Sequence, residues 1–381
     1  MVLNIFSVVT ILYFIISIYI FWEKNIFFLF YFQFLYLFYF YIGVVYYVYK
    51  EGSLNYELVL FSFFTNIFFV LFFLIGRRIF KLKKAPFYYS YNRVIIYSII
   101  LLVFFICLYY FYGFPIVSKN PYLARLFLIR GYKKYLIYYS FPIFMMILSK
   151  KFLEKHILLS LFLFIFLMSV YINTAFLSFT IYLPLYILLF ILFYNKSFIH
   201  RKIFNIIFIS IFILYLLFYI SSIRGSESIF DRIFYINYKN FKYLFYKKND
   251  IGITYIRDFK ALFTSIKSFA EIETLRMTKY KVENLVMTPT FPGELYYNFK
   301  WVGLFFSAFF GMIIGILDNL FYVHDFDNVN SKIINKIIYI NFILMFSSIV
   351  TQGIGQSYKF MIIPLLLQVS LKNRVYSLKS Q

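Results

Sequence analysis

The stretch LVLFSFFTNIFFVLFFLIGRR, residues 58–78, decides the fold class of this chain. Residues 58–76 carry no charged side chain, and Arg77 and Arg78 follow them directly. An apolar run of this length is typical of a membrane-spanning helix, and Lys and Arg collect at the cytoplasmic end of such helices. Comparable runs recur along the chain. The sequence therefore predicts an all-α polytopic integral membrane protein.

The composition supports this class. Hydrophobic residues make up 63% of the 381 positions and charged residues 14%, whereas soluble domains are about half apolar and about a quarter charged. Irregular backbone cannot face lipid, and the apolar runs are too long for barrel strands. We expect about eleven transmembrane helices, within a range of 10–12, at residues 2–21, 26–49, 58–76, 94–112, 135–149, 157–172, 175–194, 203–221, 297–317, 337–352 and 358–371.

The charge pattern predicts the orientation of these spans. The net charge is +23, but most of the Lys and Arg residues flank spans, so nucleic acid is excluded as a partner. The loop 77–93 holds six of these cations, which places it in the cytoplasm. Alternation then places the C-terminus in the cytoplasm and, with eleven spans, the N-terminus outside.

The chain divides into three predicted regions. Residues 1–221 form an N-terminal transmembrane bundle of about eight spans with a small external loop at 113–134. Residues 222–296 form one large external loop, whose apolar residues recur at helical spacing and predict amphipathic helices. Residues 297–381 supply the last spans and a short cytoplasmic tail.

The run TPTFPGELYYNFKWVG, residues 288–303, joins the large loop to the next span. Pro289, Pro292 and Gly293 are predicted to interrupt the helix there. Glu294 follows this break, where partial burial would raise its pKa and suit it to act as a base. The alternative is a carboxylate stabilised by the dipole at a helix N-terminus.

Several motifs of metal and cofactor sites are absent from the sequence. No phosphate-binding loop, no His/Cys/Glu cluster with metal-ligand spacing and no Gly-x-Ser-x-Gly turn occurs in the sequence, so we expect neither a metal nor another cofactor. Arginines on the predicted external side remain, and the guanidinium group suits phosphate because it donates two parallel hydrogen bonds. Contact with lipid headgroups or nearby acids is the alternative. These residues are Arg125, Arg130, Arg224, Arg232, Arg257 and Arg276.

The layout and the segment 288–303 resemble bacterial O-antigen or oligosaccharide repeat-unit polymerases of the Wzy type. Members of that family typically have about ten to twelve spans, a small external loop with arginines and a large external loop. A Pro…Gly-Glu…Tyr…Phe…Gly stretch then begins a late span. The matching residues here are Pro292, Gly293, Glu294, Tyr297, Phe299 and Gly303, whereas Lys300 stands where a glycine is common. Arg224-Gly225 at the start of the large loop is also similar to the family.

The resemblance implies an enzyme of the bacterial inner membrane whose active face is periplasmic. It would polymerise undecaprenyl-diphosphate-linked oligosaccharide repeat units by metal-independent glycosyl transfer. Arg224 and Glu294 would be catalytic, and Arg125, Arg130, Arg232, Arg276 and Tyr297 would bind substrate. The partners implied are the lipid-linked oligosaccharide, membrane lipids, a chain-length regulator and a flippase.

Two other functions remain open from the sequence. A flippase or transporter of the same lipid-linked sugars predicts polar or charged residues inside the spans, lining a cavity. An O-antigen ligase has a similar architecture, and an external catalytic histidine is expected there. His156, His200 and His324 all fall in predicted cytoplasmic loops.

Overall fold

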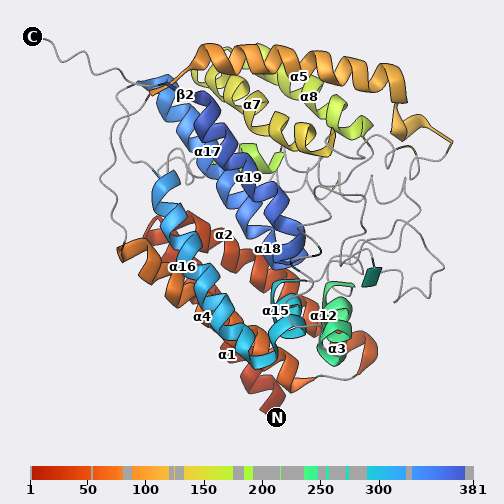
Figure 1. The fold of residues 1–381 in the computed structure, drawn as a ribbon, viewed down its shortest axis with the longest axis vertical. Coiled ribbons are helices and arrows are strands. Elements are labelled where there is room, and N and C mark those ends of the chain that lie inside the picture. Colours follow the sequence, from red (N-terminus) through yellow and green to blue (C-terminus); the bar gives the residue numbers. More distant parts are fainter. Residues whose placement is uncertain are drawn as a thin grey trace, which may run out of the picture. The chain divides into compact units, whose positions relative to one another are not determined.

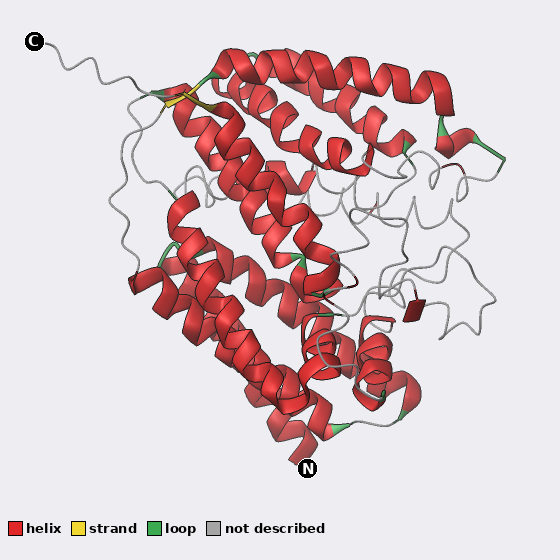
Figure 2. Cartoon of the chain, in the orientation of Figure 1, coloured by secondary structure: helices red, strands yellow, loops and turns green. Residues whose placement is uncertain are grey.

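A computed structural model describes residues 2–52, 55–79, 88–119, 133–174, 184–191, 236–247, 290–322 and 328–373, with positions 124, 215, 255, 257, 272 and 273. Helices dominate this part of the chain (Figure 2), which confirms the all-α membrane class. Six of the described helical segments are long and apolar enough to cross a membrane: Phe27–Tyr47, Tyr56–Ile79, Tyr91–Val117, Tyr135–Leu153, Phe291–Phe321 and Val329–Ser347. Shorter apolar helices are Thr10–Glu23, Leu158–Asn173 and Phe360–Leu371. Eleven spans remain a prediction, since most of 203–221 and most of 175–194 lie outside the described residues.

The chain forms two compact units, each drawn from separate stretches of sequence. The first comprises Met1–Leu82, Phe230–Leu320 and Ile343–Ile362, and the second comprises Lys83–Ile229, Phe321–Phe342 and Ile363–Gln381. Figure 1 labels their elements. Those of the first unit are α1 (Val2–Glu23), α2 (Phe27–Tyr36), η1 (Leu37–Ile42), α3 (Gly43–Glu51), α4 (Tyr56–Ile79), α12 (Ile236–Tyr246), α15 (Phe291–Phe299), η4 (Lys300–Val302), α16 (Gly303–Phe321), α18 (Ile349–Gln352) and the start of α19 (Ile354–Leu371).

Aromatic stacking joins α2 to α4 in the first unit. The Phe32 and Phe69 ring centroids lie 4.2 Å apart, and those of Phe28 and Phe73 lie 5.2 Å apart. Residue numbers rise along one helix as they fall along the other, so the two helices are antiparallel. This direction agrees with their prediction as consecutive spans.

Small residues bring α4 and α16 into close contact. A Cβ atom built on Gly311 or Gly315 would overlap the backbone carbonyl oxygen of Phe69 or Phe73, respectively. The spacing Gly-x-x-x-Gly is the one that lets membrane helices approach through their backbones. Ser307 Oγ adds a 2.7 Å hydrogen bond to the Thr65 carbonyl oxygen. Only glycine fits at these two positions unless the helices move apart.

The same contacts show that α4 and α16 run parallel. Near one end, Trp301 Nε1 donates to Glu57 Oε1 at 3.2 Å; near the other, Arg77 Nε lies 3.1 Å from Asp318 Oδ2. Two parallel spans enter the membrane from the same side, so an odd number of crossings must separate them. The sequence predicts five spans between them, which agrees with this requirement. It also predicts both members of the Arg77–Asp318 ion pair at cytoplasmic helix ends.

The second unit contains a contact between two distant segments that are both predicted to be cytoplasmic. Its elements are β1 (Tyr88–Tyr89), α5 (Tyr91–Tyr112), η2 (Pro115–Val117), α7 (Lys133–Leu153), α8 (Ile157–Asn173), the first part of α17 (Val329–Ser347), the end of α19 and β2 (Lys372–Asn373). β1 pairs antiparallel with β2, Tyr88 opposite Asn373 and Tyr89 opposite Lys372. Arg93 Nη1 donates to the carbonyl oxygens of Ser370 and Lys372, both at 3.0 Å. The predicted cytoplasmic loop 77–93 is therefore tied to the predicted cytoplasmic tail.

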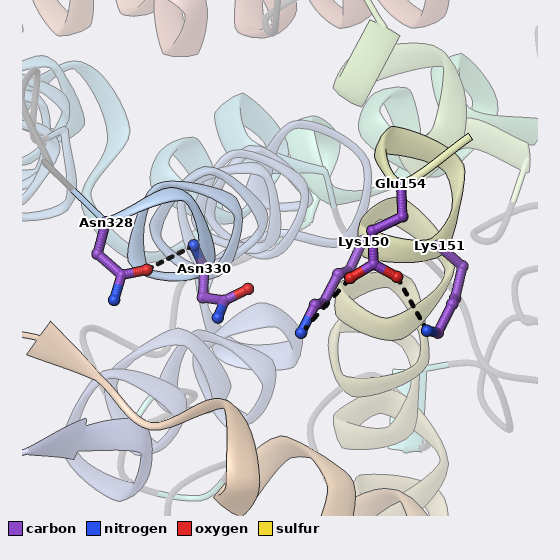
Figure 3. A network of polar contacts seen from close by, with 5 residues as sticks. All are labelled: Lys150, Lys151, Glu154, Asn328 and Asn330. Carbon is purple, nitrogen blue, oxygen red and sulfur yellow. Dashed lines mark hydrogen bonds and ion pairs between the residues drawn. The ribbon is translucent and has the colours of Figure 1, made fainter. Parts of the chain in front are cut away.

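Polar contacts at the ends of α7 and α17 fall on the same predicted side (Figure 3). Glu154 lies 2.9 Å from Lys151 Nζ and 3.7 Å from Lys150 Nζ. The hydrogen bond from Lys151 lowers the pKa of the Glu154 carboxyl below its ordinary value. The Asn330 backbone N–H donates to Asn328 Oδ1 at 2.8 Å, which caps the start of α17.

Three helices begin four or more residues before the start that the sequence predicts. α17 begins at Val329 instead of 337, and α19 at Ile354 instead of 358. The helix predicted at 297 begins at Phe291, because Pro292 and Gly293 lie inside the first turn of α15. Proline is tolerated there, where its missing N–H costs no hydrogen bond. The interruption falls instead at Lys300, between α15 and α16.

Candidate functional site

Helix α15 is short and lies between two strained residues. Thr290 precedes it with φ 60° and ψ 152°, and Lys300 follows it with φ 52° and ψ −139°. Residues other than glycine rarely adopt a positive φ angle, because their Cβ atom crowds the backbone. Strain of this kind persists only where the surroundings enforce it, and it gathers at functional sites. Both ends of α15 are thus held in a costly conformation.

Glu294 lies in the first turn of α15, and its side chain is fully buried. Its Oε2 atom accepts a hydrogen bond from the backbone N–H of Ile354, the first residue of α19. Gly353, with φ 73°, forms the turn that aims this N–H at the carboxylate. Because helix N-termini carry partial positive charge, the N-terminal ends of α15 and α19 would both stabilise an ionised Glu294 carboxylate.

Close packing fixes α15 against α12, which lies beside it in Figure 1. A Cβ atom on Gly293 would lie 2.8 Å from Thr290 Oγ1 and 3.1 Å from the Phe241 ring of α12. The Tyr297 ring is buried and packs with Leu244 of the same helix. The glycine of the Pro-Gly-Glu sequence is therefore needed for close approach of the two helices.

Glu57, at the start of α4, accepts hydrogen bonds from two aromatic side chains of the α15–η4 segment. Its Oε1 atom accepts hydrogen bonds from the Tyr296 hydroxyl at 3.3 Å and from Trp301 Nε1 at 3.2 Å. Tyr296 also stacks on Phe245 of α12, with ring centroids 3.9 Å apart. The carboxylate thus connects α4 to both α15 and η4.

Two lysines lie at the C-terminal end of α15. Lys300 Nζ donates to the Lys247 carbonyl oxygen at 3.3 Å and lies 4.6 Å from the centroid of the Tyr296 ring. Lys247 Nζ forms an ion pair with Glu273, whose side chain is 1% exposed. Tyr243 donates its hydroxyl to the same Glu273 oxygen at 3.2 Å. A buried carboxylate, a phenol and two ammonium groups therefore lie close together beside α15.

The residues predicted to form the site are only partly described. Glu294 and Tyr297 both lie in α15, and both are buried. The remaining candidates lie outside the described residues, and their roles stay predictions: Arg125, Arg130, Arg224, Arg232 and Arg276. Lys247 and Glu273 were not singled out by the sequence. They lie 26 residues apart, and neither belongs to a motif that would have indicated the pair.

The described side chains around α15 offer cations that could bind an anion. Within the described ranges, no group of three or more His, Cys, Asp or Glu side chains is placed to hold a metal ion. Lys300 and Lys247 offer cations near the predicted membrane surface, and Glu294 and Glu273 offer buried carboxylates. Hydrogen-bonding groups held this rigidly are pre-organised for charge that develops in a reaction.

Comparisons of the chain with protein-family models, with curated proteins and with solved structures find no match.

Proposed function

We propose that this chain polymerises lipid-diphosphate-linked oligosaccharide repeat units at the external face of the membrane. The observation that carries the proposal is α15, because the residues that resemble the polymerase family form one built structure. Glu294 is buried in its first turn, Gly293 allows the contact with α12, and Gly303 lies where a Cβ atom would be 2.9 Å from the Leu295 carbonyl oxygen.

The chemistry of the reaction assigns roles to the surrounding charges. A sugar hydroxyl of one lipid-linked unit attacks the sugar that is bound to diphosphate in the other. The departing diphosphate needs cations, which are Arg224 with Arg125 or Arg130 in this proposal. Lys300 and Lys247, at the end of α15, place two further ammonium groups near the same predicted surface. The acceptor hydroxyl needs a base only if its proton leaves early in the reaction.

The geometry of Glu294 favours positioning over proton transfer. A base must reach the hydroxyl that it deprotonates, and the Glu294 side chain has no exposed surface and accepts from Ile354 N–H. In this proposal Glu294 ties the strained α15 segment to the start of α19. The groups that contact the substrate would then belong to other residues around Glu294.

A transporter of the same lipid-linked sugars is the second candidate. The observation in its favour is an amide pair inside the spans, in which Gln33 Nε2 donates to Asn66 Oδ1 at 3.1 Å. Both side chains are fully buried. We place this function second because the pair carries no charge and is enclosed, whereas a transport path has to open to water on alternate sides.

Reporter fusions test the side of the membrane on which α15 begins. A reporter fused at residue 250 should show an external location. Reporters fused at residue 85 and at the C-terminus should show a cytoplasmic location. The fusion at residue 85 is the internal control, because the Arg77–Arg93 loop sets the orientation. If residue 250 were in the cytoplasm, the loop before α15 would lie on the wrong side of the membrane for the proposed reaction. That result would contradict the proposal.

A further inference from the structure

The second unit contains a cavity of about 200 Å³ between α7, α8 and the helical stretch 184–191. α7 and α8 lie side by side (Figure 1). The lining is apolar except for two serines, and includes Leu148, Phe164 and Phe190. An apolar cavity of comparable size stays dry and takes up apolar molecules. The cavity therefore suits a hydrocarbon group.

The cavity opens beside an apolar surface of α8. Two of its lining residues, Phe152 and Leu161, have 43% and 53% of their surface exposed. On α8, Leu161 belongs to an exposed apolar face at helical spacing with Leu158, Phe162 and Ile165. Both helices are predicted spans, so we expect this face to lie against the hydrocarbon tails of the membrane. A lipid acyl chain is the apolar group that reaches the cavity from that side.

Ser149 adds an unpaired hydroxyl to the lining, about one turn before the end of α7. The residue is 3% exposed, and its Oγ atom has no hydrogen-bond partner among the described residues. Buried hydroxyls are normally paired, because losing water without a replacement costs free energy. Ser160, the other serine of the lining, donates to the His156 carbonyl oxygen at 3.0 Å. The ester carbonyl at the end of an acyl chain would pair with Ser149, whereas plain hydrocarbon would not.

Three lysines lie near the turn that joins α7 to α8, with one acid, Glu154, among them. Lys150 Nζ lies 3.7 Å from the centroid of the Tyr91 ring, and Lys151 pairs with Glu154. Lys155 is exposed and has no ion-pair partner in the described part of the chain. The sequence predicts this turn in the cytoplasm, where the membrane surface is negatively charged. The charge of the turn is therefore complementary to an anionic lipid headgroup.

Lys155 occupies a position at which helices usually have glycine. Its φ angle is 63°, its N–H donates to the Phe152 carbonyl oxygen at 3.2 Å, and the His156 N–H donates to that of Lys151 at 3.1 Å. These two bonds form the helix-ending motif whose left-handed residue is most often glycine. A lysine at this position costs conformational energy. The fold thus gains nothing from Lys155, whereas a ligand for its charge would account for it.

The start of α8 adds a second group that suits an anion. No side chain caps this helix, which begins at Ile157, directly after Lys155 and His156. The free N–H groups at a helix start bind phosphate. Hydrogen bonds of the same turn reach Phe152 and Ser160 of the lining, so the cation and the cavity are adjacent. We propose that the cavity binds an anionic phospholipid, with one acyl chain between α7 and α8 and its phosphate at Lys155 and the start of α8.

Lys155→Gly tests the proposal in a folded protein, because glycine adopts the left-handed conformation without strain. The measurement is the unfolding temperature of the full chain in a neutral detergent, against added phosphatidylglycerol. A ligand that binds only the folded state raises this temperature. Lys155→Gly should need about tenfold more lipid for the same rise, since it loses a charge-assisted contact. Lys155→Arg should respond like the wild type, and an unchanged response in Lys155→Gly would overturn the proposal.

Asn25→Gly is the matched control, because Asn25 ends α1 with the same left-handed conformation, φ 57°, and carries no charge. Its response to the lipid should equal that of the wild type. Leu161→Trp narrows the opening of the cavity and should weaken the response with Lys155 intact. A full response in Leu161→Trp would mean that no acyl chain enters the cavity, which overturns the proposal.

Two other ligands separate the lipid from its parts. Phosphatidylcholine with the same acyl chains should raise the unfolding temperature much less, because its headgroup carries no net charge. Inorganic phosphate should leave the temperature unchanged, because it has no chain to fill the cavity. A rise with either ligand equal to that with phosphatidylglycerol would contradict a site for an anionic phospholipid.

Discussion

The carboxylate of Glu294 and the backbone N–H of Ile354 form a hydrogen bond between residues 60 apart in the chain. This bond joins the first turn of α15 to the first residue of α19, and the carboxylate is fully buried. Thr290 and Lys300, at the two ends of α15, have strained backbone conformations. The bond is one of the contacts that must maintain this strain. Its loss should affect the stability and the activity of the protein to different degrees.

Glu294→Ala leaves the Ile354 N–H buried without an acceptor. We expect a loss of about 1–3 kcal/mol in the free energy of unfolding, together with loss of polymer in cells. Glu294→Gln keeps an acceptor oxygen, so it should retain most of the stability and a measurable part of the activity. Unfolding in detergent and polymer yield in a complemented strain provide the two measurements. Complete loss of polymer in Glu294→Gln at unchanged stability would assign Glu294 the charge-dependent role of a base.

Alanine in place of Arg224, or of both Arg125 and Arg130, should reduce the rate of polymerisation about 10²–10³-fold. The reason is the loss of a charge-assisted contact to the departing diphosphate, which is worth roughly 2–4 kcal/mol in the transition state. Lysine should restore only part of the rate, since it lacks the planar fork of arginine. The measurement is polymer formed at equal protein level.

Arg257→Ala is the matched control for these variants, because the polymerase resemblance assigns no role to Arg257, although it is an exposed arginine of the same predicted external loop. It should leave the rate almost unchanged. Full activity in all of the alanine variants would mean that the predicted arginines only contact lipid headgroups.

Gly311→Ala tests the contact of α4 with α16. The added methyl group overlaps the Phe69 carbonyl oxygen, so the helices must separate. Overpacking of this kind costs about 1–3 kcal/mol, which would appear as a lower unfolding temperature in detergent. Phe305→Ala is the control, because Phe305 lies on the same helix with 71% of its surface exposed. Equal stability of the two variants would contradict the close contact between α4 and α16.

The pH dependence of stability should contain a contribution from Glu154. Its folded-state pKa lies below the ordinary value of 4.5 because Lys151 donates a hydrogen bond to the carboxylate. The ionised form is therefore favoured by folding, and its contribution is present above pH 4.5 and disappears as the pH falls through the lowered pKa. The effect is small, since the carboxylate is exposed to solvent.

Unfolding temperatures of the wild type and Glu154→Gln across this acid range measure that contribution. The two curves should differ at neutral pH and meet at low pH. Lys151→Gln should show the same loss, because it removes the cause of the shift. Curves that stay parallel down to low pH would exclude the pair as a source of pH-dependent stability.

The spans could be predicted from the sequence because hydrophobicity alone defines them. For α4 the prediction 58–76 lies within the observed Tyr56–Ile79. The starts of α17 and α19 were predicted too late, because polar residues such as Asn330 and Gln356 still lie on the helices. Hydropathy indicates where lipid can surround a helix, whereas backbone hydrogen bonds and caps determine where the helix ends.

The candidate site was predictable only where a local pattern indicated it. The Pro-Gly sequence drew attention to Glu294, and its position in a first helical turn was one of the two interpretations considered. The partner of Glu294 could not be predicted, because Ile354 contributes only a backbone N–H. The amide pair of Gln33 and Asn66 was missed for a similar reason. Pairings between distant residues depend on helix packing, which a single sequence does not encode in any local pattern.

Electrophoresis of surface glycolipid from a deletion strain tests the central claim most directly, in a cell whose repeat units are ligated to a lipid core. Without a polymerase, a cell still makes, flips and ligates single units, so the account predicts core carrying one repeat. Complementation with the intact chain should restore the ladder of long chains. Loss of a flippase or of a ligase would leave bare core instead. Core with no repeat in the deletion strain would therefore contradict the proposed function.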